Sequence, residues 1–338
     1  MTRVAFLLAA VSLVCGAQPK PFGRMVELGG YRLHLHCSGR GAETVVMIHG
    51  TPRFSFHFAL VQPKVAEFAR VCVYDRAGDA WSEPAPGQPS ASIFIDELDR
   101  VIRHLSPHRP VVLAGHSVGG VLARAYYAQH PERVSAMVLI DTAPLQGGQI
   151  RVNGQPRILV DATDEELRGY AAEVAGKPRP AAPKATLAAP FNKLPAQFQA
   201  AHLWATGKWQ AYAAGVDMFQ ALKYQSDLYK LAARATSATL PVWFLARAPN
   251  ADGPDPWVET QEKMAAAWAR GKMVRVAPSG HDIQLDQPGA VVAAIRDAVQ
   301  FSATARQIES TPGSDSVGRL PAVSARSSGH SGVRWRTR

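Results

Sequence analysis

The stretch Leu113-Ala114-Gly115-His116-Ser117-Val118-Gly119-Gly120 decides the fold that we predict for this chain. An apolar run at 110–113 comes before it, typical of a buried strand, and residues 118–130 have the composition of a helix. Glycines two positions from Ser117 permit a tight, strained turn between strand and helix. Such a turn raises the serine hydroxyl above the sheet and directs the Val118 amide into the same space. Glycine-flanked serines also occur by chance in loops, but the flanking elements favour a nucleophile here.

Apolar runs and helical segments alternate on both sides of this stretch. The runs at 44–48, 70–74, 134–140, 242–246 and 273–277 are typical of strands that are buried on both faces. Residues 25–28 and 31–37 flank Gly29-Gly30 and predict an antiparallel hairpin. Helical spacing is expected at 56–68, 92–105, 257–269 and 291–299. This alternation predicts an α/β chain with a mostly parallel sheet.

The alternation stops between the strands at 134–140 and 242–246, which indicates an insertion over 145–239. Thr163-Asp164-Glu165-Glu166 has the capping-box pattern that begins a helix. Residues 196–235 are helical in spacing and rich in aromatic side chains, which can be plain packing or the roof of a pocket. We therefore expect a helical cap insertion.

The two ends of the chain differ from the body in composition. Residues 1–17 have a basic start, an apolar centre and small residues at 15–17, the pattern of a signal peptide. That apolar run is too short for a stable membrane anchor. Residues 302–338 carry six arginines against Glu309 and Asp315, so this tail supplies +4 of the net charge of +10. We expect a disordered basic tail and an exported protein, with no nucleic-acid binding, since no aromatic-interleaved basic patch is present.

Export would leave Cys37 and Cys72 as the cysteines of the mature chain. Two cysteines in an oxidising compartment can form a disulfide, or they can remain two separate buried thiols.

Four separated segments, in this order, resemble the α/β-hydrolase fold family over residues 25–301. They are His49-Gly50-Thr51-Pro52, Tyr74-Asp75-Arg76-Ala77-Gly78 with Trp81-Ser82, Gly115-His116-Ser117-Val118-Gly119, and Ser279-Gly280-His281. The resemblance implies a mostly parallel eight-stranded sheet with helices on both faces, formed by residues 25–144 and 240–301. In that family the second strand lies antiparallel to the fourth, which implies that Cys37 and Cys72 are neighbours and favours the disulfide.

The resemblance also implies the roles of the site residues. Ser117 would be the nucleophile, His281 the base, and the backbone N–H groups of Thr51 and Val118 the oxyanion hole. The His-Gly-x-Pro form of the loop at Thr51 is similar to that of epoxide hydrolases and haloalkane dehalogenases, which use an aspartate nucleophile. Serine in its place points to acyl transfer. We expect His49 and His116 to brace their loops.

The sequence offers more than one candidate for the acid that orients His281. The family's usual position follows the seventh strand, which favours Asp252, with Asp255 as an alternative in the same loop. Asp141 follows the sixth strand and is a second alternative. The loop at 248–255 departs from the family's compact Gly-x-x-Asp form. Asp75 and Arg76 are expected to form a structural pair rather than a catalytic one.

Together these expectations predict an exported serine hydrolase. Its most favoured activity is that of a carboxylesterase, which cleaves an uncharged, partly apolar small-molecule ester through an acyl-enzyme. The same residues would permit an amidase, an aminopeptidase or a perhydrolase. From a different class, a non-catalytic binding protein on a hydrolase scaffold stays open because of the irregular loop at Asp252. No cofactor, metal or organic, is required by any of these alternatives.

Overall fold

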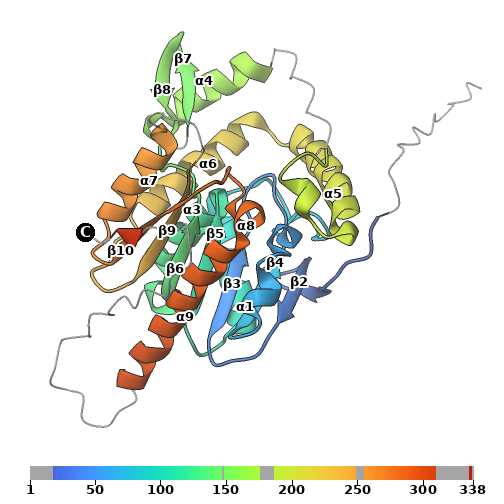
Figure 1. Ribbon diagram of the computed structural model, residues 1–338. Coiled ribbons are helices and arrows are strands. Elements are labelled where there is room, and N and C mark those ends of the chain that lie inside the picture. Colours follow the sequence, from blue (N-terminus) through green and yellow to red (C-terminus); the bar gives the residue numbers. More distant parts are fainter. Residues whose placement is uncertain (1–17, 147, 176–185, 249–254, 310–334, 337–338) are drawn as a thin grey trace, which may run out of the picture.

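A nine-stranded sheet forms the centre of the protein in the computed structural model, which describes residues 18–146, 148–175, 186–248, 255–309 and 335–336 (Figure 1). Its order is β1-β2-β4-β3-β5-β6-β9-β10-β11. The strands from β4 to β10 in this order pair in parallel, whereas β1, β2 and β11 pair antiparallel. The strands are β1 (Arg24–Glu27), β2 (Arg32–Ser38), β3 (Thr44–Ile48), β4 (Arg70–Tyr74), β5 (Val111–His116), β6 (Val134–Ile140), β9 (Val242–Arg247), β10 (Gly271–Val276) and β11 (Trp335–Arg336). The predicted mostly parallel sheet is confirmed.

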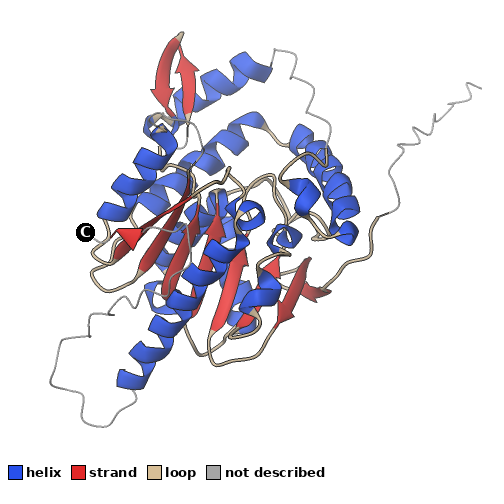
Figure 2. Cartoon of the chain, viewed as in Figure 1, coloured by secondary structure: helices blue, strands red, loops and turns tan. Residues whose placement is uncertain are grey.

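Helices cover both faces of the sheet, as the continuous apolar strands require (Figure 2). Along β5, Val111 and Leu113 join one core cluster while Val112 and Ala114 join the other. One cluster includes residues of α2 (Ala91–Leu105), α3 (Val118–Gln129), α6 (Met218–Ala233) and α7 (Pro256–Ala266). The other includes residues of α1 (Gln62–Val65), α8 (Ile283–Asp286) and α9 (Pro288–Glu309).

A disulfide joins the antiparallel strands β2 and β4. Cys37 and Cys72 lie directly opposite each other in the register of this pair. The disulfide is therefore the one that the resemblance implied.

The insertion contains a hairpin that the sequence analysis missed. Strands β7 (Gln149–Val152) and β8 (Gln155–Ile158) pair antiparallel around Asn153 and Gly154, whose φ angles are +51° and +77°. An Asn-Gly pair with two positive φ angles is the usual two-residue hairpin turn. The predicted helical cap insertion thus contains a two-stranded hairpin as well.

The rest of the insertion is helical, in α4 (Asp164–Ala175), α5 (Ala196–Gly215) and α6. The predicted capping box is present, because the Thr163 amide donates to Glu166 Oε2 at 2.7 Å and the Glu166 amide donates to Thr163 Oγ1 at 3.2 Å. In Figure 1 the hairpin and α4 lie at the top of the molecule, and α5 lies to the right.

Two further expectations need correction. Residues 56–68 form a short turn, η1 (Ser55–Phe58), and then α1, not one helix. Phe54, Phe56 and Phe58 are all buried, and side chains at every second position cannot share one face of a helix. The tail expected to be disordered begins instead with the end of α9, which extends to Glu309, and β11 pairs with the edge strand β10.

Candidate active site

Ser117 lies at the turn between β5 and α3, with φ 54° and ψ −122°. Neither neighbouring glycine tolerates a side chain there. A Cβ atom on Gly115 would lie 2.5 Å from the Gly119 carbonyl oxygen, and one on Gly119 would collide with the Ile48 carbonyl oxygen. A left-handed backbone at a serine is uncommon and is held here by close packing of the turn. The predicted strand-to-helix turn is present.

His281 lies in the loop after β10, and its imidazole is bonded to Asp141 at the end of β6. His281 Nδ1 and Asp141 Oδ2 are 2.6 Å apart. The Asp141 carboxylate is fully buried, and its Oδ1 accepts from the Arg247 amide at 3.1 Å and from Gln261 Nε2 at 2.8 Å. A carboxylate held in this way accepts the Nδ1 proton of His281 and leaves Nε2 as the acceptor.

The hydrogen-bond partner of His281 is therefore Asp141, which the sequence offered as an alternative to the favoured Asp252. Asp252 lies outside the described residues. Asp255 has a different role, because it caps α7 through the Trp257 amide at 2.9 Å and pairs with Arg247 Nε at 3.1 Å. The end of β6 lies beside β9, and this adjacency, which brings Asp141 to His281, cannot be deduced from the spacing of the motifs.

His116 connects the serine turn to the histidine loop. Its ring Nε2 lies 2.9 Å from the His281 carbonyl oxygen, and the two ring centroids are 4.7 Å apart. Burial lowers the pKa of His116 to about 4, so its ring is neutral at ordinary pH. A neutral ring that donates from Nε2 fixes the backbone of His281 next to Ser117. The expected bracing role of His116 is consistent with this contact.

Thr51 lies in the loop after β3, which packs directly against Ser117. A Cβ atom on Gly50 would lie 2.9 Å from Ser117 Cβ. Val118 is the first residue of α3, where the amide has no acceptor within the helix. The structure thus brings the two segments with the predicted oxyanion amides to Ser117.

Arg76 holds the Thr51 loop, a role that the sequence analysis missed. Its guanidinium donates to the carbonyl oxygens of His49 at 2.5 Å and Gly50 at 2.8 Å, and to Thr51 Oγ1 at 2.8 Å. His49 also braces this loop, since its Nδ1 lies 2.9 Å from the Gly50 carbonyl oxygen. The expected pair between Asp75 and Arg76 is wrong.

Asp75 and Arg76 do not pair with each other, because each has a different partner. Asp75 bonds to His34 Nδ1 at 2.8 Å and accepts from the Ser55 amide. Arg76 forms an ion pair with Asp79 at 3.3 Å. Burial raises the pKa of Asp79 to about 7, although the charge of Arg76 opposes this shift.

A cavity of about 540 Å³ opens beside Ser117 and Val118. Its apolar wall comes from the segment after β6, from β8, from α6 and from α7, and consists of Ala143, Pro144, Ile158, Tyr229, Pro256 and Trp257. The polar side chains that line it are neutral: Gln146, Gln149 and Thr260. The Trp257 ring also packs edge-on against His281, with centroids 5.3 Å apart. The volume suits a small organic ligand.

Two kinds of feature are absent from the part of the chain that the structure describes. No group of three or more His, Cys, Asp or Glu side chains is arranged to hold a metal ion there. No helix among these residues has the length and apolar character needed to cross a bilayer. Residues 1–17, which carry the predicted signal peptide, lie outside the described residues.

Comparison with known proteins gives matches to both sequences and structures. The chain is 36% identical over 125 residues to 2-hydroxymuconate semialdehyde hydrolase of Pseudomonas sp. (strain CF600), covering 36% of this chain and 44% of that protein. It is 35% identical over 136 residues to 2-hydroxy-6-oxononadienedioate/2-hydroxy-6-oxononatrienedioate hydrolase of Paraburkholderia xenovorans (strain LB400), covering 38% and 47%. The matched segments thus span less than half of either relative.

Among solved structures, a thermophilic esterase from Thermogutta terrifontis matches with a TM-score of 0.58 and 20% identity, covering 83% of this chain and 99% of that one. At this identity the likeness concerns the fold. The sequence model of the alpha/beta hydrolase fold matches residues 43–288, which include every site residue described above. The chain belongs to the alpha/beta hydrolase fold family.

Proposed function

We propose that this protein is a serine hydrolase in which Ser117 is the nucleophile, His281 the base and Asp141 the acid. The hydrogen bond between His281 and Asp141 carries the proposal, because it fixes the tautomer in which Nε2 can accept the serine proton. The strained turn at Ser117 and the contact between His116 and His281 support it, since both bring the serine and the imidazole into one site.

The reaction would proceed by acyl transfer. Ser117 Oγ attacks the substrate carbonyl carbon while His281 Nε2 takes the hydroxyl proton, and the amides of Thr51 and Val118 stabilise the oxyanion. His281 then gives its proton to the leaving alcohol, which departs and leaves an ester on Ser117. Water, activated by His281, releases the acid and restores the serine.

The cavity supports an uncharged, partly apolar ester as the substrate. No charged residue is among those that line it within the described part of the chain. The name of the relative from Paraburkholderia xenovorans denotes a dicarboxylate substrate, and a buried carboxylate requires a cationic or strongly hydrogen-bonding partner. This cavity instead favours a neutral acyl or alcohol group, so we propose a carboxylesterase.

We also propose that the protein is exported. The composition of residues 1–17 and the disulfide between Cys37 and Cys72 support this proposal, because disulfides persist mainly in oxidising compartments.

Labelling with a fluorophosphonate probe tests the nucleophile. We expect the wild-type protein to be labelled and Ser117→Ala to be unlabelled while keeping the same thermal unfolding curve. Absence of labelling in the folded wild-type protein would instead favour a binding protein on this scaffold.

Rates for p-nitrophenyl esters of increasing chain length, compared with p-nitroanilides of the same acids, test the substrate class. We expect esters to be cleaved far faster than anilides. Comparable rates would favour the amidase alternative.

A further inference from the structure

Arg53 and Asp282 form a two-point ion pair between the two loops that flank Ser117. Arg53 Nε lies 2.6 Å from Asp282 Oδ1, and Arg53 Nη2 lies 2.8 Å from Asp282 Oδ2. The side chains are 19% and 5% exposed. Parallel hydrogen bonds of this kind are strong and directional, so they fix both the distance and the orientation of the two backbones.

Each partner is also held from a second side. Arg53 Nη1 donates to the Pro52 carbonyl oxygen at 2.7 Å, and its guanidinium lies 4.8 Å from the centroid of the Phe191 ring. Gln284 Nε2 donates to Asp282 Oδ1 at 3.2 Å. Burial disfavours the charge on Asp282, but the hydrogen bond from Arg53 and the charge of Arg53 lower the pKa of this carboxyl overall. The pair is therefore charged and rigid.

The ion pair of Arg53 and Asp282 lies next to two of the proposed catalytic groups. Arg53 is two residues from Thr51, and Asp282 directly follows His281. The serine turn already contacts both loops, through Gly50 on one side and through His116 and the His281 carbonyl on the other. The ion pair joins the two loops to each other and so completes a closed set of contacts among the three segments.

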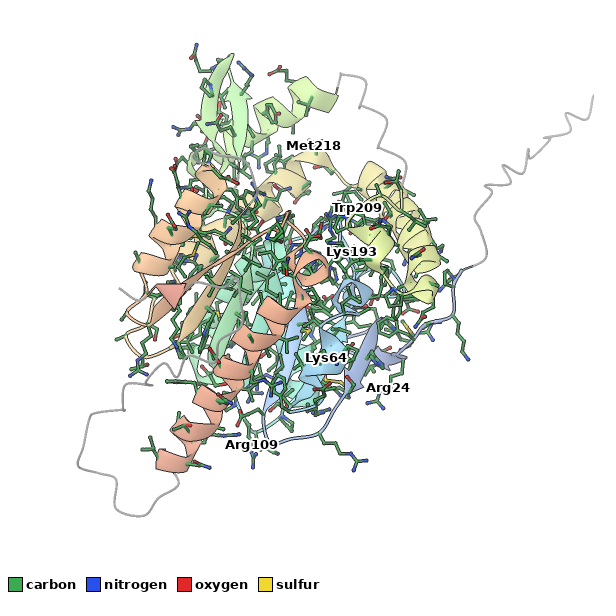
Figure 3. The ribbon with its side chains drawn as sticks, in the orientation of Figure 1. Arg24, Lys64, Arg109, Lys193, Trp209 and Met218 are labelled. Atoms are coloured by element: carbon green, nitrogen blue, oxygen red, sulfur yellow. A yellow bond between two sulfur atoms is a disulfide. The ribbon has the colours of Figure 1, made fainter. Side chains whose placement is uncertain are left out.

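The insertion contacts both Arg53 and the segment that follows His281. Phe191 and Lys193 belong to a short turn, η4 (Phe191–Lys193), that precedes α5. Lys193, which is labelled in Figure 3, places its Nζ 2.5 Å from Asp286 Oδ1 in α8. Asp286 Oδ2 accepts from the Gly280 amide at 2.9 Å. The cap thus packs on Arg53 and on the loop of His281 together.

We propose that Arg53 is a positioning residue, whose two-point ion pair with Asp282 holds the Thr51 amide and the His281 imidazole in the relative position that the transition state requires. This inference rests on the proposed function. The oxyanion contact and the proton transfer are both needed in the transition state, whereas the substrate pocket is built by other elements, α6, α7 and β8. Loss of the pair should therefore lower kcat and leave KM nearly unchanged.

Three variants test the proposal: Arg53→Gln, Asp282→Asn and Arg53→Lys. Arg275→Gln is a matched control, because Arg275 also pairs with a carboxylate from another element, Glu262, but on the exposed surface. Steady-state hydrolysis of a short p-nitrophenyl ester gives kcat and KM, and the rate of fluorophosphonate labelling reports on the nucleophile without turnover. Thermal unfolding establishes that each variant is folded at the assay temperature.

We expect kcat of Arg53→Gln and Asp282→Asn to fall roughly tenfold to hundredfold, since a misplacement of about 1 Å has effects of this size. Arg53→Lys should give an intermediate loss, because an ammonium keeps the charge but not the two-point geometry. Arg275→Gln should match the wild-type protein.

Folded Arg53→Gln with wild-type kcat would overturn the proposal, as would a change confined to KM. If Arg53→Gln fails to fold, the test rests on Arg53→Lys. Wild-type kcat in that variant would also overturn the proposal. Ser117→Ala is measured in parallel. Its loss of labelling, combined with unchanged kcat in the Arg53 variants, would refute the positioning role alone, whereas labelling of Ser117→Ala would refute the proposed function.

Discussion

The imidazole of His281 and the carboxylate of Asp141 lie 2.6 Å apart although 140 residues separate them in the sequence. Asp141 itself has a φ angle of +40°, an uncommon backbone conformation for a non-glycine residue. Strained backbone at the ends of β5 and β6 thus accompanies two of the three proposed catalytic residues.

Replacing the acid distinguishes Asp141 from the residue that the sequence favoured. We expect Asp141→Asn to lower kcat by roughly 10³- to 10⁴-fold, because an amide at this position favours the wrong tautomer of His281. Asp252→Asn should keep wild-type activity. Steady-state hydrolysis of a p-nitrophenyl ester measures both, and a larger loss in Asp252→Asn would contradict the assignment.

Alanine at Gly119 should distort the serine turn. The new Cβ would collide with the Ile48 carbonyl oxygen, and we expect a loss of about 1–3 kcal/mol in the free energy of unfolding, with little remaining probe labelling. Gly169→Ala in α4 is the control, since a Cβ there meets nothing within 4 Å and should stabilise the helix by up to about 1 kcal/mol. Urea denaturation measures both variants, and equal effects would count against close packing at the turn.

Ile158 in β8 offers a test of the cavity. Ile158→Trp should fill part of the space and lower kcat/KM for long-chain esters while leaving the acetate ester nearly unaffected. Gln155→Trp, at the exposed start of β8, is the matched control and should leave the chain-length profile unchanged. A uniform loss across all chain lengths in Ile158→Trp would indicate that the acyl group lies elsewhere.

The stability of the protein should depend on pH through Glu97. Burial raises the pKa of this carboxyl from 4.5 to about 8, although bonds from the Ala77 amide and the Tyr31 hydroxyl oppose the shift. The folded state therefore keeps a proton that the unfolded chain releases. The contribution of Glu97 to stability is fully present below pH 4.5 and is lost as the pH rises through about 8.

Glu97→Gln should remove this part of the pH dependence. The stability of the variant relative to the wild-type protein should therefore increase as the pH rises into the alkaline range. Urea midpoints at pH values from about 5 to 9 measure it. The control Glu67→Gln changes an exposed glutamate paired with Lys64 and should keep the wild-type slope. An unchanged slope in Glu97→Gln would refute the buried-carboxyl explanation.

Loss of the disulfide should lower stability without affecting the site directly. Cys37 and Cys72 are 35 residues apart, and closing a loop of this length stabilises a fold by about 3–4 kcal/mol on the loop-entropy model. Urea denaturation of the Cys37→Ser/Cys72→Ser double variant, compared with the wild-type protein before and after reduction, measures the effect. Peptide mapping of the oxidised protein that found both thiols free would contradict the disulfide.

The sheet and the serine turn could be predicted from the sequence because their signals are local. Buried parallel strands require continuous apolar runs, and the turn requires small residues at Gly115 and Gly119, so each leaves a pattern within a few residues. The capping box at Thr163 is local in the same way. The hairpin at 149–158 also has a local signal, Asn153-Gly154, but the polar residues on both sides obscured its strands.

The choice of Asp141 among the candidate partners of His281, and the loop contacts, could not be predicted because they depend on tertiary geometry. Asp141 reaches His281 only because β6 pairs with β9 and β9 with β10, so that the ends of these strands lie at one edge of the sheet. The partners of Arg76 and Arg53 are likewise set by the packing of distant loops. A long cationic side chain has many acceptors within its range, and the sequence does not select among them.

The adjacency of β6 and β9 has a consequence for how this protein can be remodelled. Parallel neighbours need one crossover to return the chain to the opposite edge of the sheet, and α6 supplies it by packing against α3. The hairpin, α4 and α5 are additional to that requirement. A change in the hairpin can therefore reshape the cavity at Ile158 while the strand connectivity is preserved. The segment 191–193 has no such freedom, because it contacts both Arg53 and Asp286.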